Sequence, residues 1–378
     1  MEFGYFAQAF VPQFLLDSDP NAEHVRLMEN LEFAVECDRN GIKYVWCPEH
    51  HFLTEYSHMP APEVFLSFVA ARTTQIHVGS AIFNTTPPVN HPARIAERVA
   101  MLDHLSEGRF EFGTGRGSST TEVFGFGIES LDVTKDMWDE TIVEFTKMWR
   151  QGMYGPHEGR FFSMPQRNVL PKPYSKPHPP MWVACGSPPT FAKAGAMGLG
   201  AFCFTTGDPR TLEPLIKAYK DAVANATPVG DYVNDNILCV TTGLCMENRK
   251  EAFDLASRIN LHYYQSLVFH WLDNIPKPPG LPAWPEMLPA PTPSEIEAGA
   301  DAGLLCIGDP DDNARLCQAY ADIGCDQLVL SPLTTTISYE EAVKSIELFG
   351  REVVPRFDKD PVHRTTRMRE AALNVDPL

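Results

Sequence analysis

Short β-type apolar runs alternate along the chain with longer stretches of helical periodicity. The pattern recurs about eight times, and such alternation is typical of βα units that build a parallel sheet. It predicts eight strands, at residues 2–9, 43–49, 76–83, 109–115, 180–184, 200–204, 237–245 and 326–331.

Two of the intervening helices carry clear boundary signals. The first has apolar residues at i, i+4, i+7 and i+8 and is predicted to end at Asn40-Gly41, a favoured C-terminal signal. Its apolar positions are Leu27, Leu31, Ala34 and Val35. In "GDPDDNARL", Asp309 is the predicted N-cap and Pro310 the first helical residue, where its missing N–H costs nothing.

Eight strands with intervening helices predict an α/β fold, the (β/α)8 TIM barrel, whose functional residues lie at the C-terminal strand ends. A doubly wound sheet is the alternative, but it usually shows G-x-G-x-x-G after its first strand, where this chain has "AQAFVPQF". We expect one barrel domain over residues 1–378. The Pro-rich segment near 274–293, "NIPKPPGLPAWPEMLPAPTP", is predicted to be an inserted loop or lid.

The net charge and the cysteine content argue against several kinds of partner and binding site. The net charge of −18 argues against nucleic acid or an anionic membrane surface, since both require a basic face. No apolar run approaches the roughly 20 residues of a membrane span, and "MEFGYFAQAF" is not a signal peptide, so a soluble, cytoplasmic protein is expected. Nine cysteines without C-x-x-C or Cys/His ligand spacing predict reduced thiols and no structural metal.

Four predicted strand ends carry polar or glycine-rich residues that would meet at one barrel mouth: "PEHHF", "GSAIFN", "FGTGRGS" and "WVACGSPPT". In "FGTGRGS" the glycines let backbone N–H groups approach a ligand, and Arg116 offers a planar cationic fork suited to phosphate. "CGSPPTFAKA" places Gly186, Ser187 and Thr190 ahead of a helix, where hydroxyls and free N–H groups could gather. Together they predict a phosphate site, although each alone is more typical of a turn or an N-cap.

Five stretches together resemble the bacterial luciferase-like, flavin-dependent monooxygenases. They are "GIKYVWCPEHHF", "IHVGSAI", "HPARIAERVAMLDHLSEGRFEFGTGRG", "FGFGI" and "PPMWVACGSPPTFAKAGAMGLG". The stretches follow that family's order at approximately its spacing, and the resemblance covers most of the chain. It implies a (β/α)8 barrel that uses FMN.

The resemblance assigns roles by position. His50 matches the family's catalytic histidine, and Arg116, Ser187 and Thr190 match residues around the FMN phosphate. Ala81 and Ile82 fall on the pair beneath the flavin ring, which often joins through a non-prolyl cis peptide.

The chain departs from the luciferases at two of these positions. Gly115 stands where the luciferases have a reactive cysteine, and Gly186 stands where they have an acidic flavin contact. The departures put luciferase-specific chemistry in question and leave the flavin-binding positions in place.

The residues at 49–51, "EHH", could serve a metal, a proton relay or a structural role. Adjacent strand residues point to opposite faces, so Glu49, His50 and His51 make a poor chelate and no metal is expected. Imidazole changes charge near neutral pH, which suits His50 at the mouth to catalysis. His51 is predicted to be structural, and Glu49 to orient a neighbouring group or cap a backbone turn.

Other candidates have simpler explanations. His91 precedes Pro92 and is predicted to cap a helix, and Cys47 and Cys185 are predicted to be small buried residues. "HYYQSLVFHWLDN", 262–274, is an aromatic helix that could be core or a substrate wall beside the Pro-rich insertion.

The resemblance implies a two-component reaction. Reduced FMN, acting as co-substrate, would come from a separate NAD(P)H:flavin reductase, since no Rossmann fingerprint is present. With O2 it would form a flavin C4a-(hydro)peroxide that oxygenates a small, apolar aldehyde, ketone or similar substrate. A homodimer or higher homo-oligomer is expected.

Two alternatives stay open. One is a deazaflavin (F420)-dependent oxidoreductase of the same superfamily, which transfers hydride without oxygen. The other is a non-catalytic, luciferase-β-like subunit, against which the retained His50 and Arg116 argue.

Overall fold

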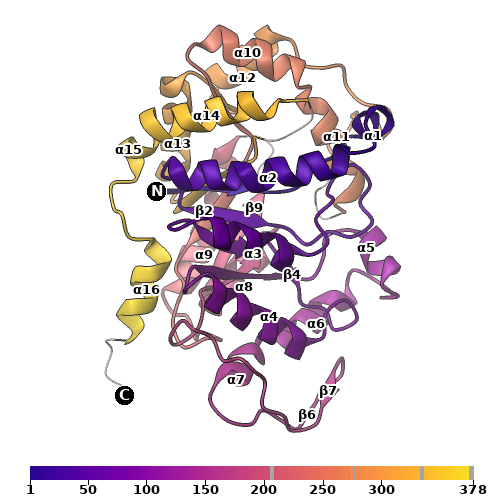
Figure 1. Ribbon diagram of the computed structural model, residues 1–378, viewed down its shortest axis with the longest axis vertical. Helices are drawn as coiled ribbons and strands as arrows, with labels where there is room; N and C mark the ends of the chain where they lie inside the picture. Colours follow the sequence, from indigo (N-terminus) through magenta and orange to yellow (C-terminus); the bar gives the residue numbers. More distant parts are fainter. Residues whose placement is uncertain (205–207, 274, 276, 333–335, 374–378) are drawn as a thin grey trace.

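A closed parallel β-barrel surrounded by helices forms the centre of the protein (Figure 1). The computed structural model describes residues 1–204, 208–273, 275, 277–332 and 336–373. The sheet order is β3-β2-β1-β13-β10-β9-β8-β5-β4, and pairing of β3 with β5 closes the barrel. This closure confirms the predicted TIM barrel and excludes an open, doubly wound sheet.

The barrel strands lie at the predicted places in the chain. They are β1 (Glu2–Phe6), β2 (Tyr44–Cys47), β3 (His77–Ser80), β4 (Phe83–Asn84), β5 (Phe110–Gly115), β8 (Met181–Ala184), β9 (Gly200–Phe204), β10 (Ile237–Thr241) and β13 (Gln327–Leu330). The remaining strands are the antiparallel pair β6 (His157–Glu158) and β7 (Ser163–Met164), and the parallel pair β11 (Gly243–Cys245) and β12 (Cys306–Gly308).

Two predicted strands prove to be divided, and two are shorter than expected. The 76–83 strand is interrupted at Ala81–Ile82, whose peptide bond is cis, so β3 and β4 are its two pieces. The 237–245 strand leaves the barrel after Thr241 and continues as β11 in a separate small sheet. The 2–9 strand stops at Phe6, and the 43–49 strand stops at Cys47 because the "PEHH" segment turns away.

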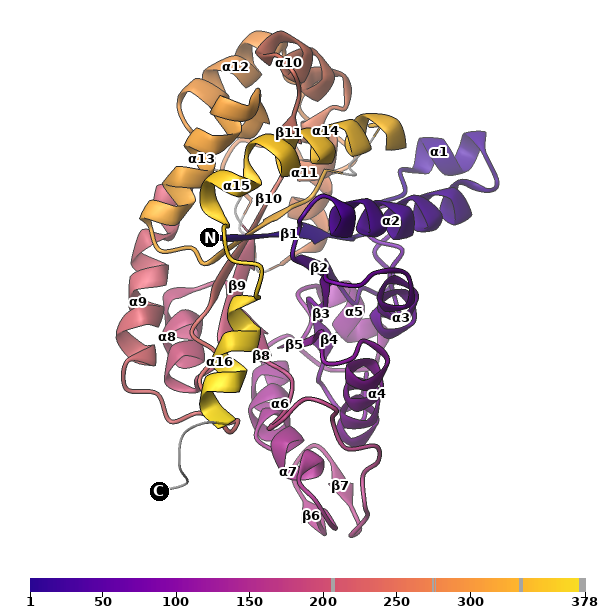
Figure 2. The ribbon, with the colours of Figure 1, turned by 60° about the vertical axis from the view of Figure 1, so that its left-hand side comes forward.

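Helices cover the outer face of the barrel (Figure 2). They are α1 (Gln13–Ser18), α2 (Ala22–Arg39), α3 (Pro62–Arg72), α4 (Pro92–Leu105), α5 (Thr120–Gly125), α6 (Val133–Ile142), α7 (Phe145–Trp149), α8 (Pro188–Ala196), the 3-10 turn η1 (Pro209–Leu212), α9 (Glu213–Val223), α10 (Arg249–Arg258), α11 (Leu261–Trp271), α12 (Pro293–Asp301), α13 (Pro310–Asp322), α14 (Tyr339–Glu352), α15 (Val354–Phe357) and α16 (Arg364–Leu373). None of the described helices is long and apolar enough to cross a bilayer.

The predicted helix boundaries are confirmed by capping contacts. Asn40 is the C-cap of α2, and the Asp309 carboxylate accepts the N–H groups of Asp311 and Asp312 at the start of α13, each at 3.0 Å. His91 caps α4, since its Nδ1 accepts the N–H of Ala93 at 3.2 Å. These local hydrogen bonds satisfy donors that a helix end would otherwise leave unpaired.

Large aromatic side chains fill the inside of the barrel. Trp46 and Trp182 meet edge to face with ring centroids 5.2 Å apart, and Phe202 packs beside them. All nine cysteines are free and buried, as predicted, Cys47 and Cys185 among them.

A buried carboxyl group closes the N-terminal end of the barrel. Glu111 of β5 contacts His77 Nδ1 at 2.8 Å and accepts hydrogen bonds from Trp182 Nε1 at 2.8 Å and Thr365 Oγ1 at 2.5 Å. Thr365 belongs to α16, which lies at the same end of the barrel as the N-terminus in Figure 1. Burial raises the pKa of Glu111, and its hydrogen bonds to Thr365 and Trp182 lower it by less, so that the pKa is about 8.

This raised pKa predicts a pH dependence of stability. Because folding raises the pKa of Glu111, its stabilising contribution is complete below about pH 4.5 and is lost as pH rises toward 8. We expect the free energy of unfolding of the wild type to fall by up to about 1.4 kcal/mol per pH unit, and Glu111→Gln to remove this slope. Urea unfolding at pH 5, 6, 7 and 8 measures it. Glu129→Gln, at an exposed carboxylate, should keep the wild-type slope, and identical slopes in all three proteins would contradict the assignment.

Candidate active site

The sequence-predicted site residues lie at the C-terminal end of the barrel, on neighbouring strands. Register pairs β5 with β8 through Thr114 and Val183, and β4 with β5 through Asn84 and Gly115. The chain segments that follow β2, β3, β5 and β8 therefore lie along one side of the mouth. This arrangement is the one expected for a TIM-barrel active site.

His50 is held by a carboxylate that the sequence analysis did not single out. Its Nδ1 lies 3.0 Å from Glu122 Oε1 of α5, and the same oxygen accepts the N–H of His51 at 2.9 Å. Glu122 follows Arg116 by six residues, so His50 is tied to the loop that carries the arginine. With Nδ1 occupied by Glu122, Nε2 is the ring nitrogen left to face a ligand.

The Glu122 carboxylate is buried and incompletely paired. Burial alone would raise the pKa of Glu122, but His50 and His51 outweigh it and hold the pKa below its ordinary value. Glu122 Oε2 has no hydrogen-bond partner among the described residues. The carboxylate therefore places negative charge directly behind the His50 ring.

Glu49 and His51 form a separate structural pair. Glu49 Oε1 lies 3.1 Å from His51 Nε2 and accepts Asn90 Nδ2 at 2.7 Å, while Oε2 accepts the backbone N–H of Asn84 at 3.0 Å. Glu49 is expected to orient a neighbouring group or to cap a backbone turn; its contacts with His51 and Asn90 agree with the first role, and the backbone N–H that it accepts belongs to β4. Among the described residues, no group of three or more His, Cys, Asp or Glu side chains could hold a metal ion.

Close packing explains the two glycines on β5. A Cβ on Gly113 would lie 1.9 Å from Ser80 O, and one on Gly115 would lie 2.7 Å from Ile82 Cγ1. Gly115 is thus required by the Ile82 side chain, which packs against the aromatic cluster inside the barrel. A cysteine at position 115 would displace that side chain.

Arg116 is half-buried and oriented by α6. Its Nη1 donates to Leu131 O at 3.0 Å and to Thr134 Oγ1 at 2.9 Å, whereas Nε and Nη2 have no partner in the described part of the chain. Burial lowers the pKa of the guanidinium, which remains cationic at any physiological pH. Arg116 is thus a fixed positive charge with N–H groups to spare.

The Gly186–Thr190 segment offers fewer N–H donors than predicted. Pro188 and Pro189 have no N–H, and Thr190 Oγ1 accepts the N–H groups of Gly186 at 3.3 Å and Ser187 at 3.1 Å. The expectation of free backbone N–H groups here is wrong, because this capping arrangement uses them. The Thr190 hydroxyl is also engaged, since it donates to Ser187 O at 2.7 Å. The Ser187 hydroxyl and the positive end of α8 remain available.

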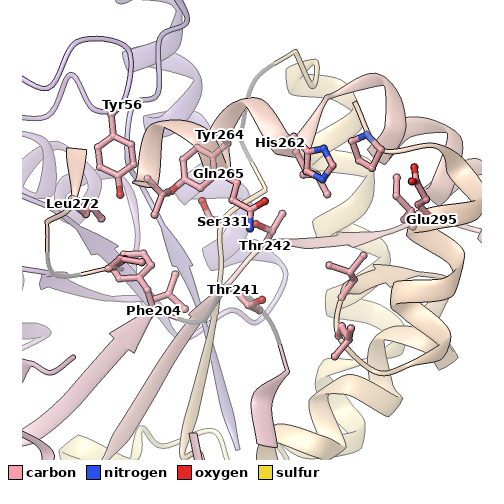
Figure 3. Close-up of a pocket in the computed structure, with 18 residues that line it drawn as sticks. Tyr56, Phe204, Thr241, Thr242, His262, Tyr264, Gln265, Leu272, Glu295 and Ser331 are labelled. Atoms are coloured by element: carbon pink, nitrogen blue, oxygen red, sulfur yellow. The ribbon is translucent and has the colours of Figure 1, made fainter. Parts of the chain in front are cut away.

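An apolar cavity of about 310 Å³ occupies the other side of the mouth (Figure 3). It lies among the ends of β9, β10 and β13, with α11 as one wall. Tyr56 lines the end of the cavity nearest the candidate site, with its ring 5.4 Å from the His50 ring and stacked on Tyr264 at 5.9 Å. The predicted 262–274 helix is α11, which ends at Trp271, and residue 274 lies outside the described residues. Tyr263 and Leu267 face the core and Tyr264 lines the cavity, so the helix contributes to both.

Residues 1–327 match the family model for luciferase-like monooxygenases. The chain belongs to this family. Its relatives include limonene 1,2-monooxygenase of Rhodococcus erythropolis, 27% identical over 95% of this chain and 87% of the relative. The oxygenase component of flavin-dependent trigonelline monooxygenase from Acinetobacter baylyi is 25% identical over 92% and 94%.

Solved structures share the luciferase-like barrel. The oxygenating constituent of 3,6-diketocamphane monooxygenase from Pseudomonas putida, in complex with FMN, has a TM-score of 0.74 at 19% identity, over 94% of this chain and 98% of that one. An F420-dependent secondary alcohol dehydrogenase in complex with an F420-acetone adduct has a TM-score of 0.70 at 17% identity, over 95% and 99%. The family therefore has both flavin and F420 relatives.

The contact between Gly115 and Ile82 predicts the result of restoring a cysteine. Gly115→Cys should destabilise the protein by about 1 to 3 kcal/mol, because overpacking forces neighbouring side chains off their rotamers. In the Ile82→Ala background, Gly115→Cys should cost much less stability, because the obstructing side chain is gone. Urea unfolding of the four proteins forms a double-mutant cycle, and strict additivity would show that Ile82 is not the obstacle.

Proposed function

We propose that this luciferase-like monooxygenase is the oxygenase of a two-component system, using externally supplied reduced FMN and O2 to oxygenate a small apolar organic molecule. The observation that carries the proposal is the division of the mouth: His50, Ala81–Ile82 and Arg116 on one side, an apolar cavity on the other. A cofactor on the first side would face a substrate in the second. When bound, reduced FMN supplies two electrons, so that one atom of O2 enters the substrate and the other leaves as water.

The residues on the cofactor side fit a phosphorylated flavin. Arg116 has unpaired N–H groups, and Ser187 offers a hydroxyl on the adjoining strand end, in a turn that Thr190 holds. Gly117 has φ +79°, a conformation that glycine tolerates and that brings the backbone close to a ligand. We assign Arg116, Ser187 and Thr190 to the phosphate, and Ala81, Ile82 and Gly186 to the surface against the ring.

His50 is proposed as the catalytic residue. Glu122 fixes its Nδ1 at 3.0 Å, which orients the ring and leaves Nε2 to hold a proton or hydrogen bond at the reacting oxygen. A pre-oriented donor of this kind lowers the barrier without rearranging during the reaction.

The Pro-rich insertion is proposed as the lid that keeps water from the reaction. Residues 274 and 276 lie outside the described residues, but the rest of the segment can be placed. Trp284 packs edge to face on Tyr263 at 5.2 Å, Pro289 O lies 2.6 Å from His262 Nδ1, and Pro291 lines the cavity. The insertion thus lies along α11 as an apolar cover, which suits a reaction that water would divert.

We also propose a homodimer and one barrel domain over residues 1–378. Support for the dimer comes from two adjacent helices that expose large apolar side chains at i, i+4 spacing: Val64 and Phe68 on α3, Met101 and Leu105 on α4. Exposed patches of this kind mark protein contacts. Support for a single domain comes from α16, whose Thr365 bonds to Glu111 inside the barrel.

The phosphate assignment predicts how an arginine variant binds flavins. Arg116→Ala should weaken FMN binding about 10 to 100-fold, because a charge-assisted hydrogen bond is lost, and should barely change riboflavin binding. Fluorescence titration of both proteins with both flavins measures the effect. An unchanged ratio of FMN to riboflavin affinity would refute the assignment.

The catalytic assignment predicts a separation of binding from chemistry at His50. His50→Ala should still bind reduced FMN but lose product yield by on the order of 100-fold, with H2O2 released instead. His51→Ala provides the matched control and should retain coupling of product to oxygen consumed. Equal coupling in His50→Ala and wild type would remove His50 from the reaction.

Oxygen and cofactor dependence test the function itself. With NADH or NADPH, FMN and O2, the purified protein should turn over negligibly, and adding an unrelated flavin reductase should restore substrate-dependent oxygenation. Hydride transfer from reduced F420 without O2 consumption would establish the alternative that the F420-dependent alcohol dehydrogenase fold supports. Rapid NAD(P)H oxidation by the protein alone would contradict the two-component scheme.

A further inference from the structure

The cavity is lined by a group of uncharged polar side chains that accept or donate no hydrogen bond among the described residues. Thr241 ends β10 and Thr242 follows it, Ser331 follows β13, and Gln265 projects from α11; all four line the cavity. Within the described residues, none of these side chains makes a hydrogen bond to another protein group. We call these four residues the polar belt.

Two members of the polar belt are held side by side by the barrel. The backbone N–H of Ser331 donates to Thr241 O at 3.0 Å, so their side chains leave adjacent strand ends. Ser331 is only 6% exposed, and its hydroxyl lies in the cavity wall (Figure 3). Because the Ser331 hydroxyl lines the cavity, a ligand there can form a hydrogen bond with it.

The belt crosses the middle of the cavity. α11 (Leu261–Trp271) runs along the cavity, roughly 16 Å at 1.5 Å per residue. Leu272, Phe204 and Tyr56 line the end near His50, whereas Leu305 and Ile296 line the far end together with His262 and Glu295; Figure 3 shows Gln265 and Ser331 between Tyr56 and His262. A ligand that fills the cavity therefore meets the belt along its middle and mostly apolar side chains toward His50.

The cavity offers no positive charge to pair with an anionic ligand. Among its described lining residues there is neither lysine nor arginine, and the Glu295 carboxylate, whose Oε2 accepts Thr292 N and Oγ1 at 2.7 and 2.8 Å, adds negative charge at the far end. His262 Nδ1 is engaged with Pro289 O. An anionic substrate would lose its hydration here without compensation.

We propose that the polar belt, led by Gln265 and Ser331, binds one neutral hydrogen-bonding group of the substrate, and so selects an uncharged, mostly apolar ketone, alcohol or amide. The 310 Å³ cavity holds roughly ten water-sized groups at about 30 Å³ each, which sets the size of the molecule. The belt positions the substrate so that its apolar part lies toward Tyr56 and His50. This inference rests on the proposed function for its reaction, although the binding it describes does not require turnover.

Three matched probes of suitable size test the proposal: 1-indanone, indane and indane-1-carboxylate. Dissociation constants from NMR titration, with and without FMN, compare one skeleton bearing a neutral acceptor, no polar group and a negative charge. Wild type should bind 1-indanone about 3 to 10-fold more tightly than indane, the range for one or two neutral hydrogen bonds, and should not bind the carboxylate measurably. Failure to prefer the ketone over the hydrocarbon, or absence of binding by both, overturns the proposal.

Variants locate the preference at the belt. Gln265→Leu and, independently, Ser331→Ala should reduce the ketone-to-hydrocarbon ratio toward one while keeping indane binding. Gln265→Arg should create measurable binding of indane-1-carboxylate. Gln318→Leu, a matched change at an exposed glutamine on α13, should leave every ratio unchanged. Unchanged ratios in both Gln265→Leu and Ser331→Ala overturn the assignment.

The same proteins separate this inference from the proposed function. Probe binding that depends on the belt, in a protein that forms no oxygenated product from reduced FMN, O2 and 1-indanone or other ketones, would refute the oxygenase proposal and leave the substrate class standing. Coupled oxygenation, with an unchanged ketone-to-hydrocarbon ratio in the belt variants, would refute the substrate class and leave the oxygenase proposal standing.

Discussion

The approach of β3 to β5 at Ser80 and Gly113 is the contact on which the active-site end of the barrel depends. The Ser80 hydroxyl donates to Gly113 O at 2.8 Å and accepts the Gly113 N–H at 3.0 Å, so a side chain completes the pairing where β3 gives way to β4. Only glycine fits at position 113, because Ser80 O occupies the place of a Cβ. The seam closes the barrel and brings the Ala81–Ile82 edge against Gly115 and Arg116.

The seam also determines where charge lies in the mouth. With β3 and β5 locked together, the short helix α5 returns Glu122 to the segment after β2, where it meets His50. All the ionisable groups assigned to chemistry lie on this side, whereas the cavity opposite carries the polar belt, His262 and Glu295 among apolar side chains. In a chain with a net charge of −18, Arg116 is a local exception whose position is set by the carbonyl of Leu131 and the hydroxyl of Thr134.

Local pattern was enough to predict the barrel, because each strand and helix cap is encoded within a few residues: periodicity located the eight strands, and Asp309 and His91 located helix starts. The same is true of the strand-end motifs, which topology brings together whatever the details of packing. Contacts between distant segments were not predictable in this way. Glu122 is 72 residues from His50 and sits in no recognisable motif, and the exit of β11 from the barrel depends on pairing with β12, a three-residue strand near position 306. The overestimate of donors near Ser187 was avoidable, since Pro188 and Pro189 cannot donate.

At the N-terminal end of the barrel, α16 contacts residues from the beginning of the chain. Glu2 Oε1, in the first strand, accepts the backbone N–H of Arg364 at 2.9 Å and Lys43 Nζ at 2.7 Å, while Thr365 reaches Glu111 in the barrel interior. These contacts span more than 350 residues at their longest, a separation that slows folding because the chain entropy is lost before the contact forms. Glu111 and His77 lose access to water from this end of the barrel only when α16 docks. Docking of this helix is therefore the step that dehydrates the buried carboxyl group.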